Sequence, residues 1–219
     1  MREISDAFGF GQAICANGAL HYDLINEKII EQWLIPLEIQ FEFISRMREA
    51  LPTVSFAVEY DEKFYREKIY VPRWDIGADN VGVQKIEEKL TQPAFKIMAR
   101  CSDYDHTSDE MLAIAGPLTS DIVTVTHSNA DESLLEISAL GVSKGETLEK
   151  LAARKGIGAK DSVTFGDNPN DFSMLRWAER SWAMSNGHHD GVKNAKFVAQ
   201  ADHLDGVAIV IEQLLELSA

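Results

Sequence analysis

Cysteine, basic residues and long apolar runs are all scarce in this chain. Its two cysteines, Cys15 and Cys101, lie far apart and in no metal-binding spacing, so we expect two reduced thiols. Lys and Arg number 21 against 35 Asp and Glu, and the formal net charge is −14. Nucleic-acid binding is not expected, because phosphate contacts require clustered Lys and Arg. No apolar run approaches the roughly 18 residues of a membrane span, and the first residues lack the apolar segment of a signal peptide. We therefore expect a cytoplasmic protein with no membrane partner.

The composition leaves room for one large domain or two small ones. The 219 residues are 45% hydrophobic, which is enough to form a hydrophobic core. The acidic charge does not exclude a phosphorylated small molecule, because a bound divalent cation reverses the local field. None of the six histidines pairs at i, i+4 on a clear helix, so no zinc site is expected. His188 and His189 lie in a polar loop, where solvated side chains are the default; contact with a substrate is the alternative.

The segment from Ser162 to Leu175 carries the strongest local signal. The apolar run Val163 to Phe165 predicts a buried parallel strand, and Asp167 follows it directly. Asn168-Pro169 then suits the N-cap and first position of a helix, which places Asp171 at the third helical position. Ligands of open α/β sheets bind at this carboxyl edge of the strands.

The two carboxylates of this segment differ in how well structure alone explains them. An acidic residue in a first helical turn is favoured by the helix dipole, so Asp171 is explained without a function. Asp167 lies between a buried strand and a turn that already has a capping residue, so neither strand packing nor helix capping explains a carboxylate at this position. The position of Asp167 therefore indicates a functional residue, whereas Asp171 can be either.

The sequence Gly166-Asp-Asn-Pro-Asn-Asp171 followed by Phe-Ser-Met-Leu resembles the fourth motif, G-D-x-x-N-D-x-x-M-L, of the haloacid dehalogenase (HAD) superfamily in its Cof-like sugar-phosphatase branch. The resemblance implies that Asp167 and Asp171 hold Mg²⁺ and that Asn170, beside the substrate phosphate, has a catalytic and substrate-binding role. Downstream, Trp182 to Asn186 resembles the next core strand and Asp205-Gly-Val-Ala208 the start of the last helix.

Two further segments carry the same resemblance. Gly141-Val-Ser-Lys-Gly145 resembles the third motif, whose lysine steadies the nucleophile and the phosphate, and this assigns Lys144 a catalytic and substrate-binding role. From position alone Lys144 is a cation in a first helical turn, locally unfavourable and otherwise solvated. Ile14 to Ala19 resembles the end of the third core strand, and this assigns substrate binding to Asn17 and Gly18. By position, Asn17-Gly18 is only a turn signal.

The region between these segments has a different pattern. Residues 24–133 predict an α+β domain, and the resemblance implies that it is a C2-type cap inserted into a Rossmann-like core of residues 1–23 and 134–219. Its aromatic residues are expected in the core of the cap rather than in a substrate platform. The expected elements are strands near 29–34, 54–60, 64–71, 95–99, 123–125 and 135–137, and helices over 36–50, near 83–90, and from Thr107 to Gly116-Pro117.

The family's first motif, D-x-D-G-T, which carries the nucleophile, has no counterpart in residues 1–23. The resemblance therefore implies an N-terminally truncated core. We expect such a chain to hydrolyse p-nitrophenyl phosphate no faster than buffer, and to self-associate through unpaired strand edges.

The predicted function is that of a Mg²⁺-dependent HAD phosphatase acting on a small phosphorylated metabolite such as a sugar phosphate. A phosphomutase is a weaker rival. The alternative from another class is a non-catalytic HAD-derived protein that binds metal or phosphometabolite, or serves as an interaction module.

Overall fold

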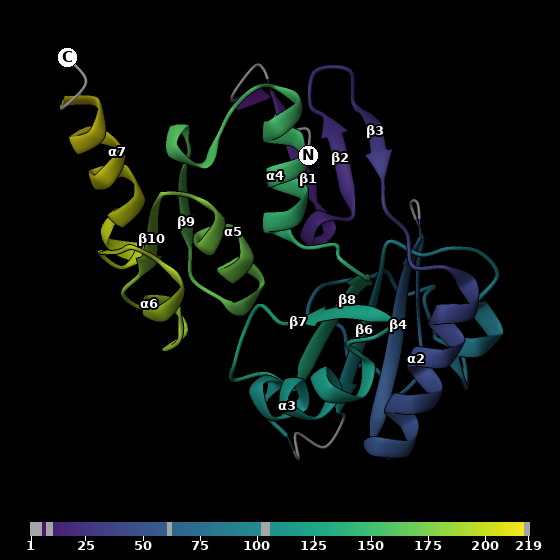
Figure 1. Ribbon diagram of the computed structural model, residues 1–219. Helices are drawn as coiled ribbons and strands as arrows, with labels where there is room; N and C mark the ends of the chain where they lie inside the picture. The colour runs from purple at the N-terminus through teal and green to yellow at the C-terminus, as the bar shows by residue number, and fades with distance from the viewer. Residues whose placement is uncertain (1–5, 8–10, 61–62, 102–105, 217–219) are drawn as a thin grey trace. The chain divides into compact units, whose positions relative to one another are not determined.

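The computed structural model describes residues 6–7, 11–60, 63–101 and 106–216 (Figure 1). The predicted core segments 1–23 and 134–219 include residues 1–5, 8–10 and 217–219, which lie outside the described residues. The chain divides into two compact units, residues 1–143 and 144–219, and each unit has sheets of its own. Among the described residues, no helix is both long and apolar enough to cross a membrane.

The first unit is built on a five-stranded antiparallel sheet of order β5-β4-β6-β8-β7. Alternating apolar residues in each strand place one row of side chains on each face. The strands are β4 (Val54–Tyr60), β5 (Lys63–Arg66), β6 (Lys96–Cys101), β7 (Val123–Thr126) and β8 (Leu134–Ala139). The sheet continues through β8 to Ala139.

Two helices supply the main core of this unit. Helices α2 (Leu37–Ala50) and α3 (Ser108–Thr119) share one hydrophobic cluster with β4, β6 and β8, in which Phe43, Phe56 and Met111 are fully buried (Figure 1). The predicted capping box starts α3, because Thr107 Oγ1 accepts the N–H of Glu110 at 3.2 Å. The helix does not end at Gly116-Pro117 as predicted but continues to Thr119, since a proline in the last turn interrupts few helical hydrogen bonds.

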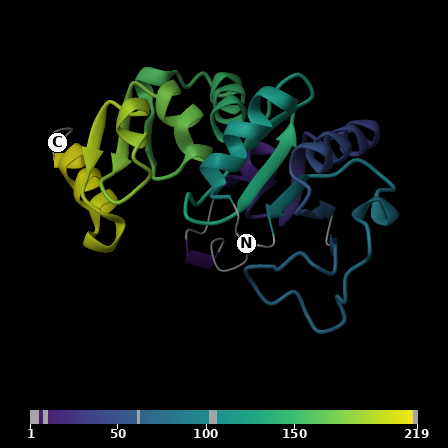
Figure 2. The ribbon, with the colours of Figure 1, turned by 90° about the horizontal axis from the view of Figure 1, so that it is seen from below.

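The long connection from β5 to β6 covers part of the other face of the sheet. Its Tyr70 packs against Ala57, Met98 and Leu134, and Figure 2 shows this connection as the blue-teal loop away from α2 and α3. The predicted second helix near residues 83–90 is wrong: only a 3₁₀ turn, Ile86–Lys89, forms there. Leu90 leaves the helical region with φ −79° and ψ 99°, so the turn cannot propagate.

A small antiparallel sheet precedes these elements in the first unit. Strands β1 (Gln12–Cys15), β2 (Leu20–Asp23) and β3 (Lys28–Gln32) lie in the order β1-β2-β3, with the 3₁₀ turn Ala16–Gly18 between the first two. The first unit thus includes residues 1–23, which the resemblance grouped with residues 134–219. The inserted cap as a domain of its own stays a prediction.

The second unit contains the predicted parallel sheet, of order β11-β10-β9. The rings of Phe165, Trp182 and Phe197 stack across its three strands, at centroid distances of 5.5 and 5.0 Å. The strands are β9 (Val163–Gly166), β10 (Arg180–Met184) and β11 (Phe197–Ala199), and the helices are α4 (Lys144–Arg154), α5 (Phe172–Trp177), α6 (Gly191–Asn194) and α7 (Gly206–Glu216), with 3₁₀ turns at Ala159–Asp161, Pro169–Asp171 and Asp202–Leu204.

Candidate active site

The loop after β9 forms the centre of the candidate site. Residue 168 takes the N-cap position, as predicted, and the 3₁₀ turn Pro169–Asp171 leads directly into α5. The amide of Asn168 does not cap the turn: its Nδ2 donates to Asp167 Oδ2 at 2.6 Å. Asp171 caps the turn instead, because its Oδ2 accepts the N–H of Asn168 at 3.3 Å. The strand-to-helix turn is thus held by side chains of its own sequence.

The Asp171 carboxylate is buried, and both of its oxygens have partners. Oδ1 accepts from Lys144 Nζ at 2.5 Å, and Oδ2 also accepts from the N–H of Asp167 at 3.0 Å. Its side chain is only 7% exposed. A buried carboxylate is costly unless it is paired and hydrogen-bonded, and here both conditions are met. Asp171 therefore joins three segments: the first turn of α4, the end of β9 and the start of α5.

Asp167, in contrast, is an exposed residue. Partial desolvation and then the Asp171 carboxylate raise the pKa of Asp167 above its ordinary value, while the Lys144 ammonium opposes this rise. The backbone of Asp167 is firmly held, since its carbonyl accepts the N–H of His188 at 2.6 Å. The loop therefore presents an accessible carboxylate on a fixed backbone, which suits a direct ligand to a cation.

Lys144 is aimed at this loop by close packing between α4 and α5. The N–H of Gly145 donates to Ser173 Oγ at 3.0 Å, which satisfies one of the unpaired amides of the first turn of α4. A Cβ at residue 145 would lie 2.4 Å from the carbonyl carbon of Ser173, so only glycine permits this approach. The Lys144-Gly145 pair in the sequence is thus a requirement of the packing.

We expect Gly145→Ala to destabilise the protein by about 1–3 kcal/mol, because the added methyl group has to push the two helices apart. Denaturant unfolding followed by circular dichroism measures the change. The control is Glu149→Ala on an exposed position of the same helix, where a change within about 0.5 kcal/mol is expected. Equal stabilities of the two variants would show that α4 and α5 are not packed as described.

The predicted site residues fall into both units. Lys144, Asp167, Asn170 and Asp171 lie around one loop of the second unit, with Asn170 only 9% exposed. Asn17 and Gly18 lie in the first unit, in the 3₁₀ turn after β1, where Asn17 has the left-handed φ of 56°.

A charged pair lies in the same unit as Asn17 and Gly18. Burial disfavours the ionised form of Glu136 on β8, but the Lys96 ammonium and its hydrogen bond lower the pKa of Glu136 below its ordinary value. Lys96 Nζ lies 2.8 Å from Glu136 Oε1. Lys96 and Glu136 thus form a largely buried ion pair between β6 and β8 of the five-stranded sheet.

Some contributors to the site are missing from the sequence prediction. Ser173 Oγ accepts the N–H of Gly145 beside Lys144, and the N–H of His188 donates to the Asp167 carbonyl. Neither contact has a distinctive residue pattern. Gly145, the small residue directly after Lys144, is the one feature of the sequence that indicates the contact with Ser173.

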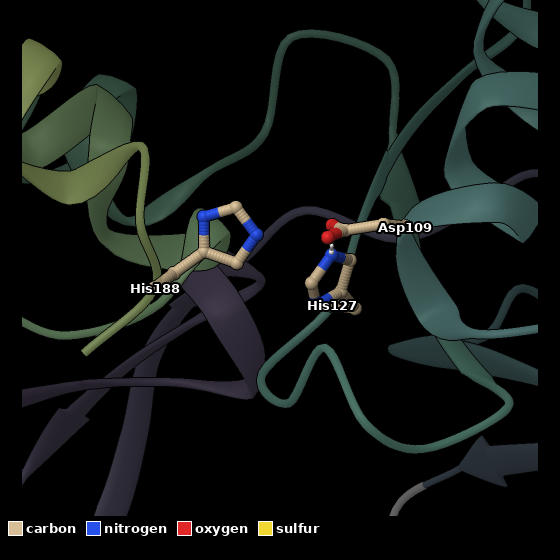
Figure 3. A group of neighbouring side chains, drawn as sticks. All are labelled: Asp109, His127 and His188. Carbon is tan, nitrogen blue, oxygen red and sulfur yellow. Dashed lines mark hydrogen bonds and ion pairs between the residues drawn. The ribbon is translucent and has the colours of Figure 1, made fainter. Parts of the chain in front are cut away.

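A separate histidine pair lies in the first unit. The fully buried His127 pairs with Asp109, with Nε2 2.8 Å from Oδ1 (Figure 3). The sequence analysis singled out only His188 and His189 and did not predict this pair.

Comparison with solved structures confirms the fold class. The crystal structure of SMU.1108c from Streptococcus mutans covers 98% of this chain and 82% of its own, with a TM-score of 0.77 and 22% identity. The HAD subclass IIB sugar phosphatase BT4131 covers 97% of this chain and 78% of its own, with a TM-score of 0.74 and 18% identity. At these identities the likeness shows the fold alone: a mixed α/β, Rossmann-like fold.

Similarity to characterised sequences covers less of the chain. The phosphatase YwtE of Bacillus subtilis, named for 5-amino-6-(5-phospho-D-ribitylamino)uracil, is 34% identical over 91 residues, 42% of this chain and 32% of its own length. A phosphoglycolate phosphatase of Halorubrum lacusprofundi is 35% identical over 78 residues, 36% of this chain and 34% of its own length. The alignments thus span about a third of these relatives.

The match to a family is far more extensive than any of these alignments. The family model of the haloacid dehalogenase-like hydrolases matches residues 1–211. This range includes both predicted motifs, around Lys144 and from Asp167 to Asp171. The chain therefore belongs to the haloacid dehalogenase-like hydrolase family.

Proposed function

We propose that the protein is a Mg²⁺-dependent phosphomonoester hydrolase whose substrate is a small phosphorylated metabolite such as a sugar phosphate. The observation that carries the proposal is the arrangement around Asp171, which pairs with Lys144 and fixes the exposed Asp167 beside it. Such a site combines a cation for phosphate with an oxygen ligand for a metal, as phosphoryl transfer requires.

The donor set of the loop fits Mg²⁺. Mg²⁺ prefers oxygen ligands and is commonly bound through one or two carboxylates. Asp167 is accessible for direct coordination, whereas both oxygens of Asp171 already accept hydrogen bonds, so Asp171 serves as a positioning group. Mg²⁺ bound at Asp167 would neutralise charge on the phosphoryl oxygens.

Two further requirements, a cation and an amide beside the phosphate, are supplied by residues of this chain, whereas residues 1–23 hold no counterpart of the nucleophile motif D-x-D-G-T. Lys144 extends from the first turn of α4 and its side chain is 32% exposed, so its ammonium can contact a phosphate oxygen while Asp171 holds it in place. Asn170 contributes an amide from the same turn. Fixing these groups before the substrate arrives lowers the cost of organising them during the reaction.

The proposed substrate class is a small phosphomonoester. The two relatives described above are named for chemically different phosphomonoesters, which supports the reaction type rather than a substrate. We infer that residues 24–133 form the cap, and that Asn17 and Gly18 contribute to substrate binding.

Lys144→Ala is expected to lower kcat/KM at least about 100-fold, because a charged donor to the developing transition-state charge is lost. The assay measures Mg²⁺-dependent release of phosphate from a panel of sugar phosphates by protein that also carries a D-x-D-G-T segment, because residues 1–23 have no counterpart of that motif. Lys155→Ala, at an exposed position beyond the end of α4, is the control and should keep full activity. Turnover that is unaffected by Lys144→Ala would refute the assignment. Metal binding without any turnover would favour the non-catalytic alternative.

A further inference from the structure

Three consecutive side chains converge at the turn after β10. One potential ligand atom from each of His188, His189 and Asp190 lies within 4.8 Å of the others. The imidazole rings of His188 and His189 have centroids 4.2 Å apart, and Figure 3 shows the His188 ring. Two imidazoles and a carboxylate are a donor set for Zn²⁺ and similar ions, whereas Mg²⁺ takes oxygen ligands.

The distances are close to those of a zinc site. Zinc–ligand bonds of about 2.0–2.2 Å place the donors of a tetrahedral ion about 3.4 Å apart. His189 Nε2 already lies 3.4 Å from Asp190 Oδ2. The third donor, from His188, has to come closer. The His189 and Asp190 side chains are 72% and 35% exposed, so small rotations that adjust the site meet little packing.

The present partners of these groups leave room for a cation. Lys193 Nζ pairs with Asp190 Oδ1, which leaves Oδ2 facing His189. The hydrogen bond from Lys193, and then the two histidines, lower the pKa of Asp190, so its carboxylate is ionised at neutral pH. His188 Nδ1 accepts the N–H of Asp190 at 3.1 Å, and a metal ion on that nitrogen would replace this hydrogen bond.

We propose that His188, His189 and Asp190 bind Zn²⁺ or a similar borderline divalent ion, and that this binding changes the Asp167 loop. The turn and the loop are in direct contact, since the N–H of His188 donates to the Asp167 carbonyl oxygen at 2.6 Å. A Cβ at Gly187 would lie 2.5 Å from the same oxygen, so the contact is close-packed. A metal-induced movement of the turn therefore reaches Asp167.

The test is a Zn²⁺ titration of the protein against a fluorescent chelator. We expect one Zn²⁺ ion bound per chain in the micromolar range, and at least about tenfold weaker binding for His189→Ala, because one of three ligands is removed. His203→Ala is the control: His203 is 69% exposed and lies 3.3 Å from Asp202, a comparable pair outside the cluster. Equal affinities of wild type and His189→Ala would overturn the site.

Two further measurements separate this proposal from the phosphatase proposal. Asp167→Asn should bind Zn²⁺ as wild type does, whereas loss of binding would place the ion on the Asp167 loop and overturn the proposal. Zn²⁺ should change amide hydrogen exchange in residues 163–172 of wild type but not of His189→Ala. Unchanged exchange in wild type would overturn the link to the loop. None of these results depends on phosphatase activity.

Discussion

Asp167→Asn should abolish most of the Mg²⁺-dependent phosphatase activity, by at least about 100-fold in kcat, because the Lewis-acid contribution of a metal ion is worth several kcal/mol. The substitution keeps the shape of the side chain but removes the charge that holds the cation. Its effect on folding should be small, since Asp167 is exposed. Steady-state kinetics with varied Mg²⁺ on protein that also carries a D-x-D-G-T segment, together with a thermal unfolding scan, measures both expectations.

The matched control is Asp161→Asn, at an exposed residue just before β9 whose Oδ2 accepts the N–H of Gly158 at 3.3 Å. This variant should have the activity and Mg²⁺ dependence of wild type. If Asp167→Asn and Asp161→Asn lose the same small fraction of activity, Asp167 does not hold the metal.

Glu67→Ala should destabilise the protein by about 3–5 kcal/mol, the cost of removing one partner from a buried ion pair. Glu67 is 1% exposed. Its carboxylate pairs with Arg48 and accepts the N–H groups of Phe56 at 3.1 Å and Ile86 at 2.9 Å. Truncation therefore leaves two buried amides without an acceptor as well as an arginine that has lost a partner.

Glu87→Ala separates the effect of burial from that of the charge. Glu87 also pairs with Arg48, at 2.9 Å, but its side chain is 30% exposed, so its removal should cost about 1 kcal/mol or less. Denaturant unfolding of both variants gives the comparison. A cost for Glu67→Ala no larger than that for Glu87→Ala would mean that the carboxylate does not organise the β4–β5 region.

Local signals predicted much of the fold. The apolar run at residues 163–165, the N-cap position of Asn168 and the Thr107–Glu110 capping box all correspond to elements of the structure. These features depend on neighbouring residues in the chain. The predictions near residues 83–90 and at Pro117 failed because longer-range contacts or helix context decide them: the N–H of Ile86 donates to the distant Glu67, and α3 tolerates proline in its last turn.

The candidate site was predictable as a set of residues but not as an arrangement. The motif indicated that Asp167 and Asp171 are both functional. Only the structure shows that Asp171 is buried, with both carboxylate oxygens accepting hydrogen bonds, while Asp167 is exposed. The contact between Gly145 and Ser173 joins residues 28 positions apart. No periodicity in the sequence encodes such a pairing.

Mn²⁺ soaked into crystals of the protein, located by its anomalous scattering, tests the central claim most directly. Mn²⁺ accepts the same oxygen ligands as Mg²⁺. We predict one peak within about 2.5 Å of a carboxylate oxygen of Asp167, with Lys144 still paired to Asp171, and no such peak in Asp167→Asn crystals. A wild-type peak elsewhere, or none at Asp167 at saturating Mn²⁺, would contradict a metal-dependent phosphatase site at this loop.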